Sequence, residues 1–209
     1  MTYLSAEMQA YYAARTPPFD AVYLKPERKN DLVFLTHHIP TQLADLKVLE
    51  LACGSSFWTQ YIAPHSRRLV ATDATAEPLE FAKLRPDTSS VTFLQLDAYR
   101  IPPEVGQFSG AFAGLWFSHV PIQARAEFLR SLHARREPGA RVLFLDNSIV
   151  QCHEHPITET DDQGNTYQHR RLNDGSMHRV LKNFPNATEL HDRVEPFATN
   201  VTYSGLDNF

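Results

Sequence analysis

The chain has 209 residues, 43% of them hydrophobic, and a formal net charge of −4 at pH 7. This length and composition predict one domain, residues 1–209, with a complete core. The acidic balance argues against a nucleic-acid or membrane partner, and no apolar run approaches the roughly twenty residues that cross a bilayer. The cysteines, Cys53 and Cys152, suit a reducing compartment. We therefore expect a cytoplasmic monomer or homodimer with a small-molecule partner.

The predicted elements follow an α/β order along the chain. Residues 1–40 are expected to form a helical lid, with helices near Leu4–Ala14 and Glu27–His38 on either side of a proline-rich stretch. From Lys47 onward, β-rich runs alternate with segments of helical spacing. The five runs are KVLEL, RLVATD, VTFLQLD, FSGAFAGLWF and ARVLFLDN. This alternation predicts a doubly wound, mainly parallel sheet covered by helices on both faces.

The pattern changes after Asn147. Residues 150–184 contain two polar-alternating arms around Asn173-Asp174-Gly175, which is typical of a β-hairpin, and we expect this insertion to select the substrate. A last helix over Asn186–Val194 and a strand over Ala198–Tyr203 are predicted to follow.

A turn of small residues, Ala52-Cys53-Gly54-Ser55-Ser56, follows the first predicted strand. In an open parallel sheet, ligands bind outside the carboxyl ends of the strands, where this turn is expected to lie. Its small side chains leave the backbone open to a ligand. Gly54 is the single glycine of the turn and no Gly-Lys-Ser/Thr follows, which disfavours a nicotinamide dehydrogenase and a phosphate-binding loop.

Signals at the ends of four predicted strands resemble the class I S-adenosylmethionine-dependent methyltransferases. They are Glu50-Leu51-Ala52-Cys53-Gly54, Asp73, Asp97-Ala98 and Gly114-Leu115-Trp116. Further segments resemble a branch of small bacterial enzymes that methylate small molecules, with phosphonate O-methyltransferases among the relatives. These segments are Tyr11-Tyr12-x-x-Arg15, Trp58-Thr59, Ser118-His119-Val120-Pro121 and Arg171-x-x-Asp174-Gly175 with Lys182. The resemblance covers nearly the whole chain.

This resemblance implies a seven-stranded, Rossmann-like sheet, with S-adenosyl-L-methionine as cofactor and S-adenosyl-L-homocysteine as product. The chain stops soon after the last predicted strand, where this fold normally adds a final antiparallel strand. The sheet is therefore expected to end in a very short strand or to be incomplete at its C-terminal end. The implied cofactor-binding residues are Tyr12, Arg15, Glu50, Ala52, Gly54, Trp58, Asp73, Ala74, Asp97, Ala98, Gly114 and Leu115.

The chemistry of the implied cofactor site suits these residue types. Asp73 lies about twenty residues past the turn and suits two hydrogen bonds from a ribose diol. Asp97 suits the adenine amino group, and Arg15 suits the methionine carboxylate. Each has an alternative interpretation: a helix cap or surface charge for the acids, a surface ion pair for Arg15 and a core aromatic for Tyr12.

Two positions depart from the pattern of the resembled branch. Ser56 stands where most relatives have the last glycine of Gly-Thr-Gly, which costs about 1 kcal/mol if the φ angle is positive. We expect a negative φ, which would let the Ser56 hydroxyl cap the following helix. Phe19 stands where relatives commonly have tyrosine.

The predicted acceptor site lies after the fourth strand. His119 is the candidate catalytic base, with a hydrogen-bonded structural histidine as the alternative. Tyr23 and Trp116 are candidate substrate-binding aromatics. Arg171 and Lys182 are predicted to converge on an anionic acceptor such as a carboxylate or phosphonate, with a solvated hairpin face as the alternative. No metal site is expected.

The function predicted from the sequence is methyl transfer to an oxygen, rather than a nitrogen, of a small and anionic metabolite. The alternative is a non-catalytic module on the same fold that binds a cofactor or a partner. Ser56 favours this alternative, because a strained turn would weaken cofactor binding.

Overall fold

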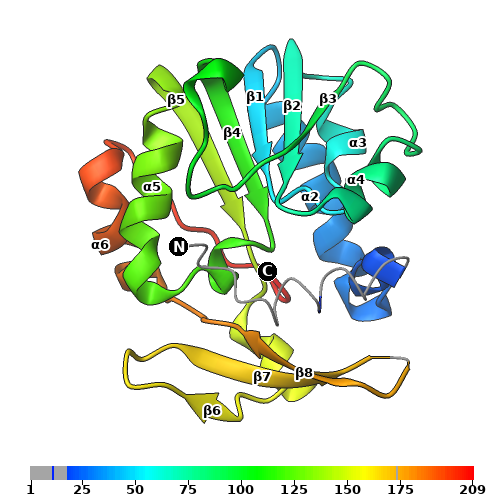
Figure 1. Ribbon diagram of the computed structural model, residues 1–209, viewed down its shortest axis with the longest axis vertical. Coiled ribbons are helices and arrows are strands. Elements are labelled where there is room, and N and C mark those ends of the chain that lie inside the picture. Colours follow the sequence, from blue (N-terminus) through cyan, green and yellow to red (C-terminus); the bar gives the residue numbers. More distant parts are fainter. Residues whose placement is uncertain (1–10, 12–17, 173) are drawn as a thin grey trace.

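The computed structural model describes residues 11, 18–172 and 174–209. Its central sheet has five strands, all parallel, in the order β3-β2-β1-β4-β5 (Figure 1). The strands are β1 (Lys47–Leu51), β2 (Arg68–Asp73), β3 (Thr92–Gln95), β4 (Phe108–Gly114) and β5 (Arg136–Leu145). The strand order reverses at β1, which pairs with β2 on one side and β4 on the other. The turn after β1 therefore lies at the switch point of the sheet, where open α/β sheets bind ligands.

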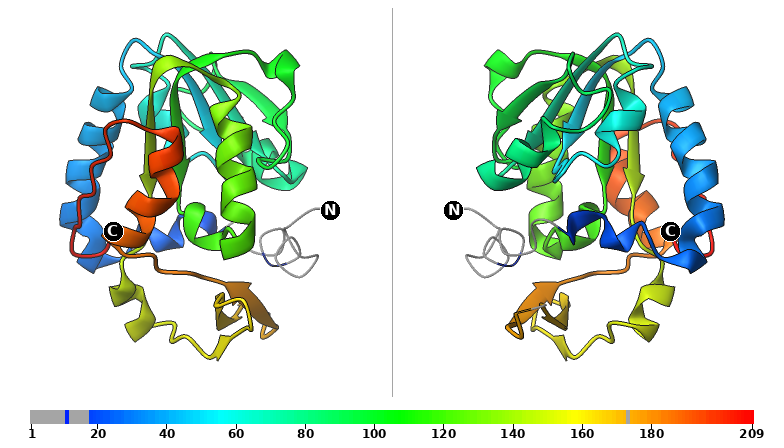
Figure 2. Two further views of the ribbon diagram at one scale, coloured as in Figure 1. Left: turned by 90° about the vertical axis from the view of Figure 1, so that its left-hand side faces the viewer. Right: turned by 90° about the vertical axis from the view of Figure 1, so that its right-hand side faces the viewer.

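Helices cover both faces of the central sheet, with α2 and α5 on opposite sides (Figure 2). The α-helices are α2 (Lys29–Gln42), α3 (Thr59–Ile62), α4 (Ala76–Ala82), α5 (Arg125–His133) and α6 (Ala187–Val194). The 3₁₀ helices are η1 (Pro18–Val22), η2 (Pro26–Arg28), η3 (Pro103–Val105), η4 (Phe117–His119), η5 (Ile122–Ala124), η6 (Ile149–His153) and η7 (Glu195–Phe197). Among the described residues, no helix combines the length and the apolar character that crossing a bilayer requires.

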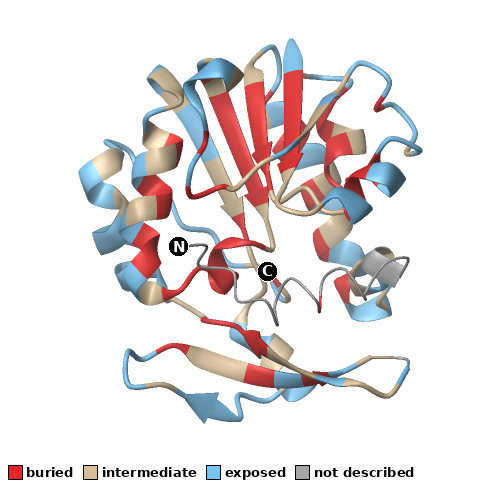
Figure 3. Ribbon diagram, in the orientation of Figure 1, coloured by how far each residue is buried: buried red, intermediate tan, exposed pale blue. Residues whose placement is uncertain are grey.

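Alternation along the strands supplies two cores, one on each face of the sheet. In β1, Val48 packs into the core that contains Leu35 of α2, whereas Leu49 and Leu51 pack into the core that contains Phe128 of α5. Figure 3 shows buried residues running along β1, β2 and β4. The central strands are thus buried on both faces, which holds their carboxyl ends rigidly in place.

A second sheet lies beyond the carboxyl ends of the central strands (Figure 1). It consists of β6 (Glu159–Thr160), β7 (Thr166–Arg171) and β8 (Met177–Leu181) in antiparallel pairing. Strands β7 and β8 are the two arms of the predicted hairpin. The chain after β8 is attached to the loop after β4, because Asn183 N–H donates to the carbonyl of Ser118 at 2.8 Å.

Two predictions about the chain ends have different outcomes. The predicted last helix is α6, which begins after Asn186 with a capping box formed by Asn186 and Glu189. The predicted strand over Ala198–Tyr203 is wrong, because these residues form no strand. The described residues therefore place five strands in the central sheet rather than seven.

The C-terminal segment contacts the helical layer instead of extending the sheet. Asn208 N–H donates to Asp31 of α2 at 2.8 Å, and Phe209 is buried under the guanidinium of Arg28, 4.9 Å from its ring centroid. At the other end, the first predicted helix falls largely outside the described residues. The second corresponds to η2 and α2.

Candidate active site

The turn after β1 has a strained backbone that several hydrogen bonds fix. Its φ angles are 52° at Ala52, 55° at Gly54 and 67° at Ser56, all in the left-handed region. Gly54 N–H donates to Asp73 Oδ2 at 3.0 Å, and Ser56 N–H donates to the carbonyl of Cys53 at 2.9 Å. Strained conformations of this kind persist only where their surroundings determine them. The hydrogen bond between Gly54 and Asp73 shows that the turn and Asp73 lie close together, as predicted.

Ser56 does not have the negative φ that we predicted. Its φ of 67° is one that L-residues rarely adopt, which costs about 1 kcal/mol relative to glycine. The predicted cap is also wrong, because α3 begins after Trp58 without a side-chain cap. Trp58 and Thr59, which follow the turn, are buried in the core.

Asp73 and Asp97 lie at the same edge of the sheet. Leu96 N–H donates to the carbonyl of Asp73 at 2.9 Å, so the segment carrying Asp97 and the buried Ala98 runs directly beside the end of β2. The Asp97 carboxylate accepts from Tyr99 N–H at 2.9 Å. Burial raises the pKa of Asp73, and its hydrogen bonds oppose that shift. The half-buried Ala74 adjoins Asp73 at this edge.

Glu50 is a buried acid at the end of β1. Its side chain accepts a hydrogen bond from Thr59 Oγ1 at 2.7 Å, which joins β1 to α3. Burial raises the pKa of Glu50 to about 8, although the Thr59 bond favours the ionised form. Glu50 is therefore mainly protonated at neutral pH.

Packing explains the glycine at the end of β4. A Cβ on Gly114 would lie 2.8 Å from Trp58 Cδ1, which is too close, and 3.0 Å from Phe112 Cζ, which is a tight contact. Leu115 follows with a φ of 56°, and its N–H donates to the carbonyl of Leu145 at 2.7 Å. Gly114 is thus required by neighbouring side chains, independently of any ligand at its carbonyl.

The candidate aromatics lie in two different environments. The Tyr23 ring stacks on Phe57 with centroids 3.7 Å apart, and its hydroxyl accepts from Trp58 Nε1 at 3.0 Å. Trp116 is buried in the core, with edge contacts to the rings of Tyr99 and Phe128. Tyr23 therefore covers the start of α3, whereas Trp116 packs beneath the site. Tyr12 and Arg15 lie outside the described residues.

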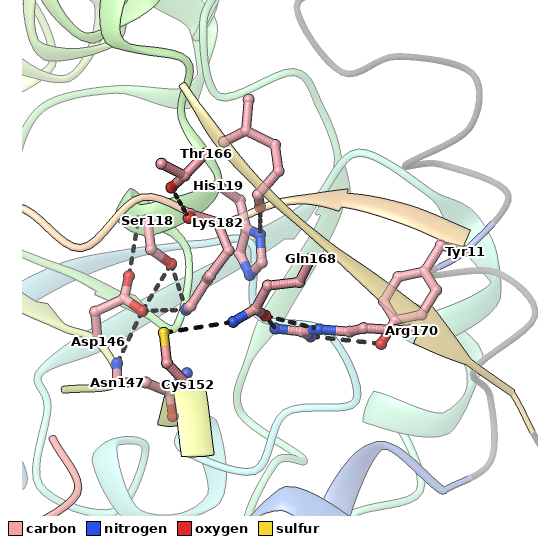
Figure 4. Close-up of polar contacts among 11 residues, drawn as sticks. Tyr11, Ser118, His119, Asp146, Asn147, Cys152, Thr166, Gln168, Arg170 and Lys182 are labelled. Atoms are coloured by element: carbon pink, nitrogen blue, oxygen red, sulfur yellow. Dashed lines mark hydrogen bonds and ion pairs between the residues drawn. The ribbon is translucent and has the colours of Figure 1, made fainter. Parts of the chain in front are cut away.

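A buried polar cluster joins the hairpin to the carboxyl ends of β4 and β5 (Figure 4). Lys182 Nζ pairs with Asp146 Oδ1 at 2.7 Å and donates to Ser118 Oγ. Asp146 also accepts from Ser118 N–H at 2.8 Å and from Ser118 Oγ at 2.7 Å. Burial lowers the pKa of Lys182 to about 8. Burial alone would raise the pKa of Asp146, but the charge of Lys182 and the hydrogen bonds from Lys182 and Ser118 hold it below its usual range.

The sequence analysis missed Ser118 and Asp146 as members of this cluster. A signal was present for Asp146, because an aspartate directly after a predicted parallel strand lies at the ligand-binding edge of the sheet. Its partner Lys182 comes from a separate sheet, however, and the sequence pattern does not show where that sheet packs.

Arg171 does not converge with Lys182, so that prediction is wrong. Arg171 pairs with Met177, and Lys182 N–H donates to the carbonyl of Thr166 at 2.8 Å. Lys182 lies opposite Thr166, so these two side chains share a face of the hairpin. Thr166 and Arg171 are an odd number of positions apart, so the Arg171 side chain points to the other face. Arg171 is exposed.

Arg170 is the arginine on the inner face of the hairpin. It is buried, and its Nε and Nη2 donate to Gln168 Oε1 at 3.1 and 2.6 Å. Its Nη1 lies 3.5 Å from the hydroxyl of the buried Tyr11 (Figure 4). Arg170, rather than the predicted Arg171, is therefore the arginine of β7 that shares a face with Lys182.

His119 has one ring nitrogen assigned by its surroundings. Nδ1 lies 2.6 Å from the carbonyl of Leu181, and since a carbonyl only accepts, Nδ1 carries the proton. Burial lowers the pKa of His119 well below its usual range, and the charges of Lys182 and Arg170 add to that effect. The neutral ring that results leaves Nε2 as the nitrogen able to accept a proton.

Comparisons with known proteins agree with this arrangement. A family model described as a methyltransferase domain matches residues 48–139. The structure of a DhpI-SAH complex is 25% identical over 91% of this chain and 85% of that chain, with a TM-score of 0.74. A DhpI-SAM-HEP complex is also 25% identical, over 91% and 86%, with a TM-score of 0.73. The family model and these two structures together support a class I S-adenosylmethionine-dependent methyltransferase.

A further comparison, at lower sequence identity, bears only on the fold. The PH0226 protein of Pyrococcus horikoshii OT3 is 15% identical over 95% of both chains, with a TM-score of 0.75. Among curated proteins, none matches the sequence.

Two further buried cations, Arg28 of η2 and Arg170 of β7, act electrostatically on Lys182. Arg28, Arg170 and Lys182 are 3%, 6% and 0% exposed. Arg28 Nη1 is buried and has no hydrogen-bond partner among the residues that the structure describes, and the charges of Arg28 and Arg170 both lower the pKa of Lys182. Asp146 balances one of these cations through its ion pair with Lys182. Glu154, Glu27 and Asp31 act electrostatically on Arg28, whereas the partners described for Arg170 are the neutral Gln168 and Tyr11. A buried charge is costly without a counter-charge, so the surroundings of Arg170 favour an anion.

Proposed function

We propose that this methyltransferase transfers a methyl group from S-adenosyl-L-methionine to an oxygen of a small, anionic metabolite and releases S-adenosyl-L-homocysteine. The observation that carries the proposal is the buried cluster of Arg28, Arg170 and Lys182 beside His119, at the carboxyl edge of the sheet. An anionic acceptor would supply a counter-charge to Arg170 and would bring its oxygen close to the base.

The cofactor fits the residues at the ends of β1, β2 and β3. Asp73 accepts from Gly54 N–H, Thr75 N–H and Thr75 Oγ1, and Asp97 accepts from Tyr99 N–H. Each carboxylate has about four lone-pair positions, so Asp73 retains room for one further donor and Asp97 for more. They therefore suit the ribose diol and the adenine amino group, and the turn at Gly54 leaves its backbone accessible. Glu50 orients the turn from below through Thr59. Bound S-adenosylmethionine supplies an electrophilic methyl group on a sulfonium ion.

We assign the role of general base to His119. With Nδ1–H donated to Leu181, the orientation of the imidazole is fixed and Nε2 accepts the proton of an acceptor hydroxyl. The lowered pKa keeps the ring neutral near pH 7, so the base is in its active form. An acceptor that is already an oxyanion would not need this step.

The segments that flank the central sheet would enclose the reaction. The hairpin insertion, residues 150–184, contributes Arg170 and Lys182, and the N-terminal segment, residues 1–40, contributes Tyr23. Enclosing the site excludes water and aligns acceptor, methyl and sulfur for an in-line displacement. We further propose that the protein is cytoplasmic, acts as a monomer or homodimer, and has a small-molecule substrate.

Calorimetric titration with S-adenosylhomocysteine tests the cofactor, and methyl transfer from labelled S-adenosylmethionine tests the acceptor. The acceptor panel would contain small phosphonates, carboxylates and amines of matched size. We expect micromolar cofactor binding and turnover of anionic oxygen acceptors. Turnover of amines alone would refute the oxygen and anion assignments. Cofactor binding with no turnover of any acceptor would favour the non-catalytic module.

A further inference from the structure

A second polar cluster lies at the turn after β1 and shares no residue with the Lys182 cluster. It is formed by Asp20 of η1, Ser55 of the turn and Arg85, which follows α4. The Arg85 Nη2 pairs with the carboxylate of Asp20. Its Nε donates to the carbonyl of Ser55 at 2.8 Å, and Nη2 lies 3.3 Å from Ser55 Oγ. One guanidinium thus joins three segments that are far apart in the sequence.

The bond to Ser55 holds the backbone of the turn beside the strained Ser56. Ser55 lies between Gly54 and Ser56, whose φ angles are 55° and 67°. On the opposite side, Asp73 accepts from Gly54 N–H. The Asp73 carboxylate therefore holds the N–H of Gly54, and the Arg85 guanidinium holds the carbonyl of the following residue, Ser55. Two such opposed bonds fix the orientation of the peptide groups between them.

The bond to Asp20 fixes the segment that leads to Tyr23. The carbonyl of Asp20 accepts from Tyr23 N–H at 2.8 Å and from Leu24 N–H at 3.2 Å, so the position of Asp20 sets that of Tyr23. The Tyr23 ring then stacks on Phe57, just beyond the turn. The ion pair is partly shielded, with side-chain exposures of 20% for Arg85 and 32% for Asp20.

We propose that Arg85 is a positioning residue that holds the cofactor-binding turn and the η1 segment in one arrangement, so that the cofactor meets a preformed site. The role in cofactor binding rests on the proposed function; the mechanical coupling does not. Lysine cannot replace Arg85 in this role, because a single ammonium lacks the fork that contacts a carboxylate and a carbonyl together.

The test compares Arg85→Met with Lys83→Met. Lys83 is a matched control, since it lies at the same end of α4 and pairs only with the exposed Glu80 among the interactions described for it. Hydrogen exchange would be followed at the amides of Tyr23, Leu24 and Ser56, and at strand β1 as an internal reference. We expect about tenfold faster exchange at the three amides in Arg85→Met and wild-type rates in Lys83→Met.

Asp20→Asn separates the two bonds of the guanidinium. It is expected to speed exchange at Tyr23 and Leu24 but to leave Ser56 near its wild-type rate, because the bond from Arg85 to Ser55 remains. Unchanged exchange at all three amides in Arg85→Met would overturn the proposal. So would an equal acceleration in β1, which would indicate a loss of global stability.

Calorimetry with S-adenosylhomocysteine supplies the functional readout. We expect the dissociation constant to rise about tenfold in Arg85→Met and to stay unchanged in Lys83→Met. In turnover assays, the KM for the methyl donor should rise while kcat at saturation changes little. If the wild-type protein bound no cofactor, the proposed function would fail, and the exchange rates would still decide the coupling. An unchanged dissociation constant in Arg85→Met would overturn the positioning role.

Discussion

Gly54 and Asp73 are joined by a hydrogen bond of 3.0 Å from the Gly54 N–H to Asp73 Oδ2. This bond links the turn after β1 to the end of β2, so the residue proposed to bind the ribose also supports the backbone beneath it. The two roles can be separated, because an amide oxygen at position 73 can still accept from Gly54.

Asp73→Asn is therefore expected to weaken cofactor binding more than it weakens folding. We expect the dissociation constant for S-adenosylhomocysteine to rise at least about tenfold, since hydrogen bonds to a charged group contribute roughly 1.5–3 kcal/mol. The free energy of unfolding should fall by only about 1 kcal/mol. Calorimetry and urea denaturation measure the two effects. Equal binding by wild type and Asp73→Asn would remove Asp73 from the cofactor site.

Ser56→Gly should stabilise the protein. Glycine adopts the φ of 67° without the steric cost that serine has, although it increases the entropy of the unfolded chain. The expected gain is about 0.5–1 kcal/mol in the free energy of unfolding, or roughly 1–4 °C in Tm. Gly54→Ala, at a φ of 55°, should have the opposite effect. A lower Tm for Ser56→Gly would mean that the Ser56 side chain contributes more than its backbone strain costs.

Glu50 should make the stability of the protein depend on pH. Because its pKa is raised to about 8 in the folded state, the folded protein holds a proton that the unfolded chain releases above its own value near 4.5. The Glu50 contribution is thus fully present below pH 4.5 and is lost as pH rises from 4.5 to 8. Its slope approaches about 1.4 kcal/mol per pH unit.

Glu50→Gln should remove this component while keeping an acceptor for Thr59. Urea denaturation at pH 5, 6, 7 and 8 measures it as a difference between the two proteins. Parallel stability curves for wild type and Glu50→Gln would show that Glu50 titrates normally in the folded state.

Arg170 and Arg171 form a natural matched pair for testing the anion site. They are adjacent in β7, but Arg170 is buried on the inner face and Arg171 is exposed. We expect Arg170→Met to raise the KM for an anionic acceptor about tenfold or more, since a charge-assisted contact is lost. Arg171→Met should leave that KM unchanged. The reverse ranking would place the acceptor on the outer face of the hairpin.

His119→Gln should lower kcat by about 10²-fold or more if the acceptor is a hydroxyl, as expected for the loss of a general base. Cofactor affinity should not change. In the wild type, kcat should fall as pH drops through the lowered pKa of His119, because protonation removes the base. Full activity in His119→Gln with an ionised acceptor would instead assign His119 a structural role through Leu181.

The sequence predicted the central strands and their site residues because both depend on local patterns. Buried parallel strands form continuous apolar runs, and residues that directly follow them must lie at one edge of the sheet. The placement of Asp73 and Asp97 at one edge of the sheet was predicted in this way, whereas their role in binding the cofactor stays a prediction. The backbone angle of Ser56 was not predicted, since it is set by Asp73 and by neighbouring bonds rather than by its own residue type.

The errors in the hairpin and at the C-terminus have a shared physical cause. Whether Arg170 or Arg171 faces inward depends on the register between β7 and β8, and a change of one position exchanges the two faces. Ala198–Tyr203 has residues that suit a strand, yet strand formation needs a partner, and this segment leads instead to the contacts of Asn208 and Phe209 with the α2 layer. Which segments pair, and in which register, depends on the tertiary structure and cannot be predicted from the local sequence pattern.

The basic face of the second sheet has an evolutionary consequence. Gln168, Arg170 and Lys182 are carried by a hairpin outside the main core, whereas Asp73 and Asp97 belong to the edge of the central sheet. Under the proposed function, substitutions on the hairpin would change which acceptor is recognised while the scaffold proposed to bind the methyl donor stays intact. Relatives that share this scaffold are expected to diverge fastest at alternate hairpin positions, and acceptor specificity should be transferable between them by exchanging this one segment.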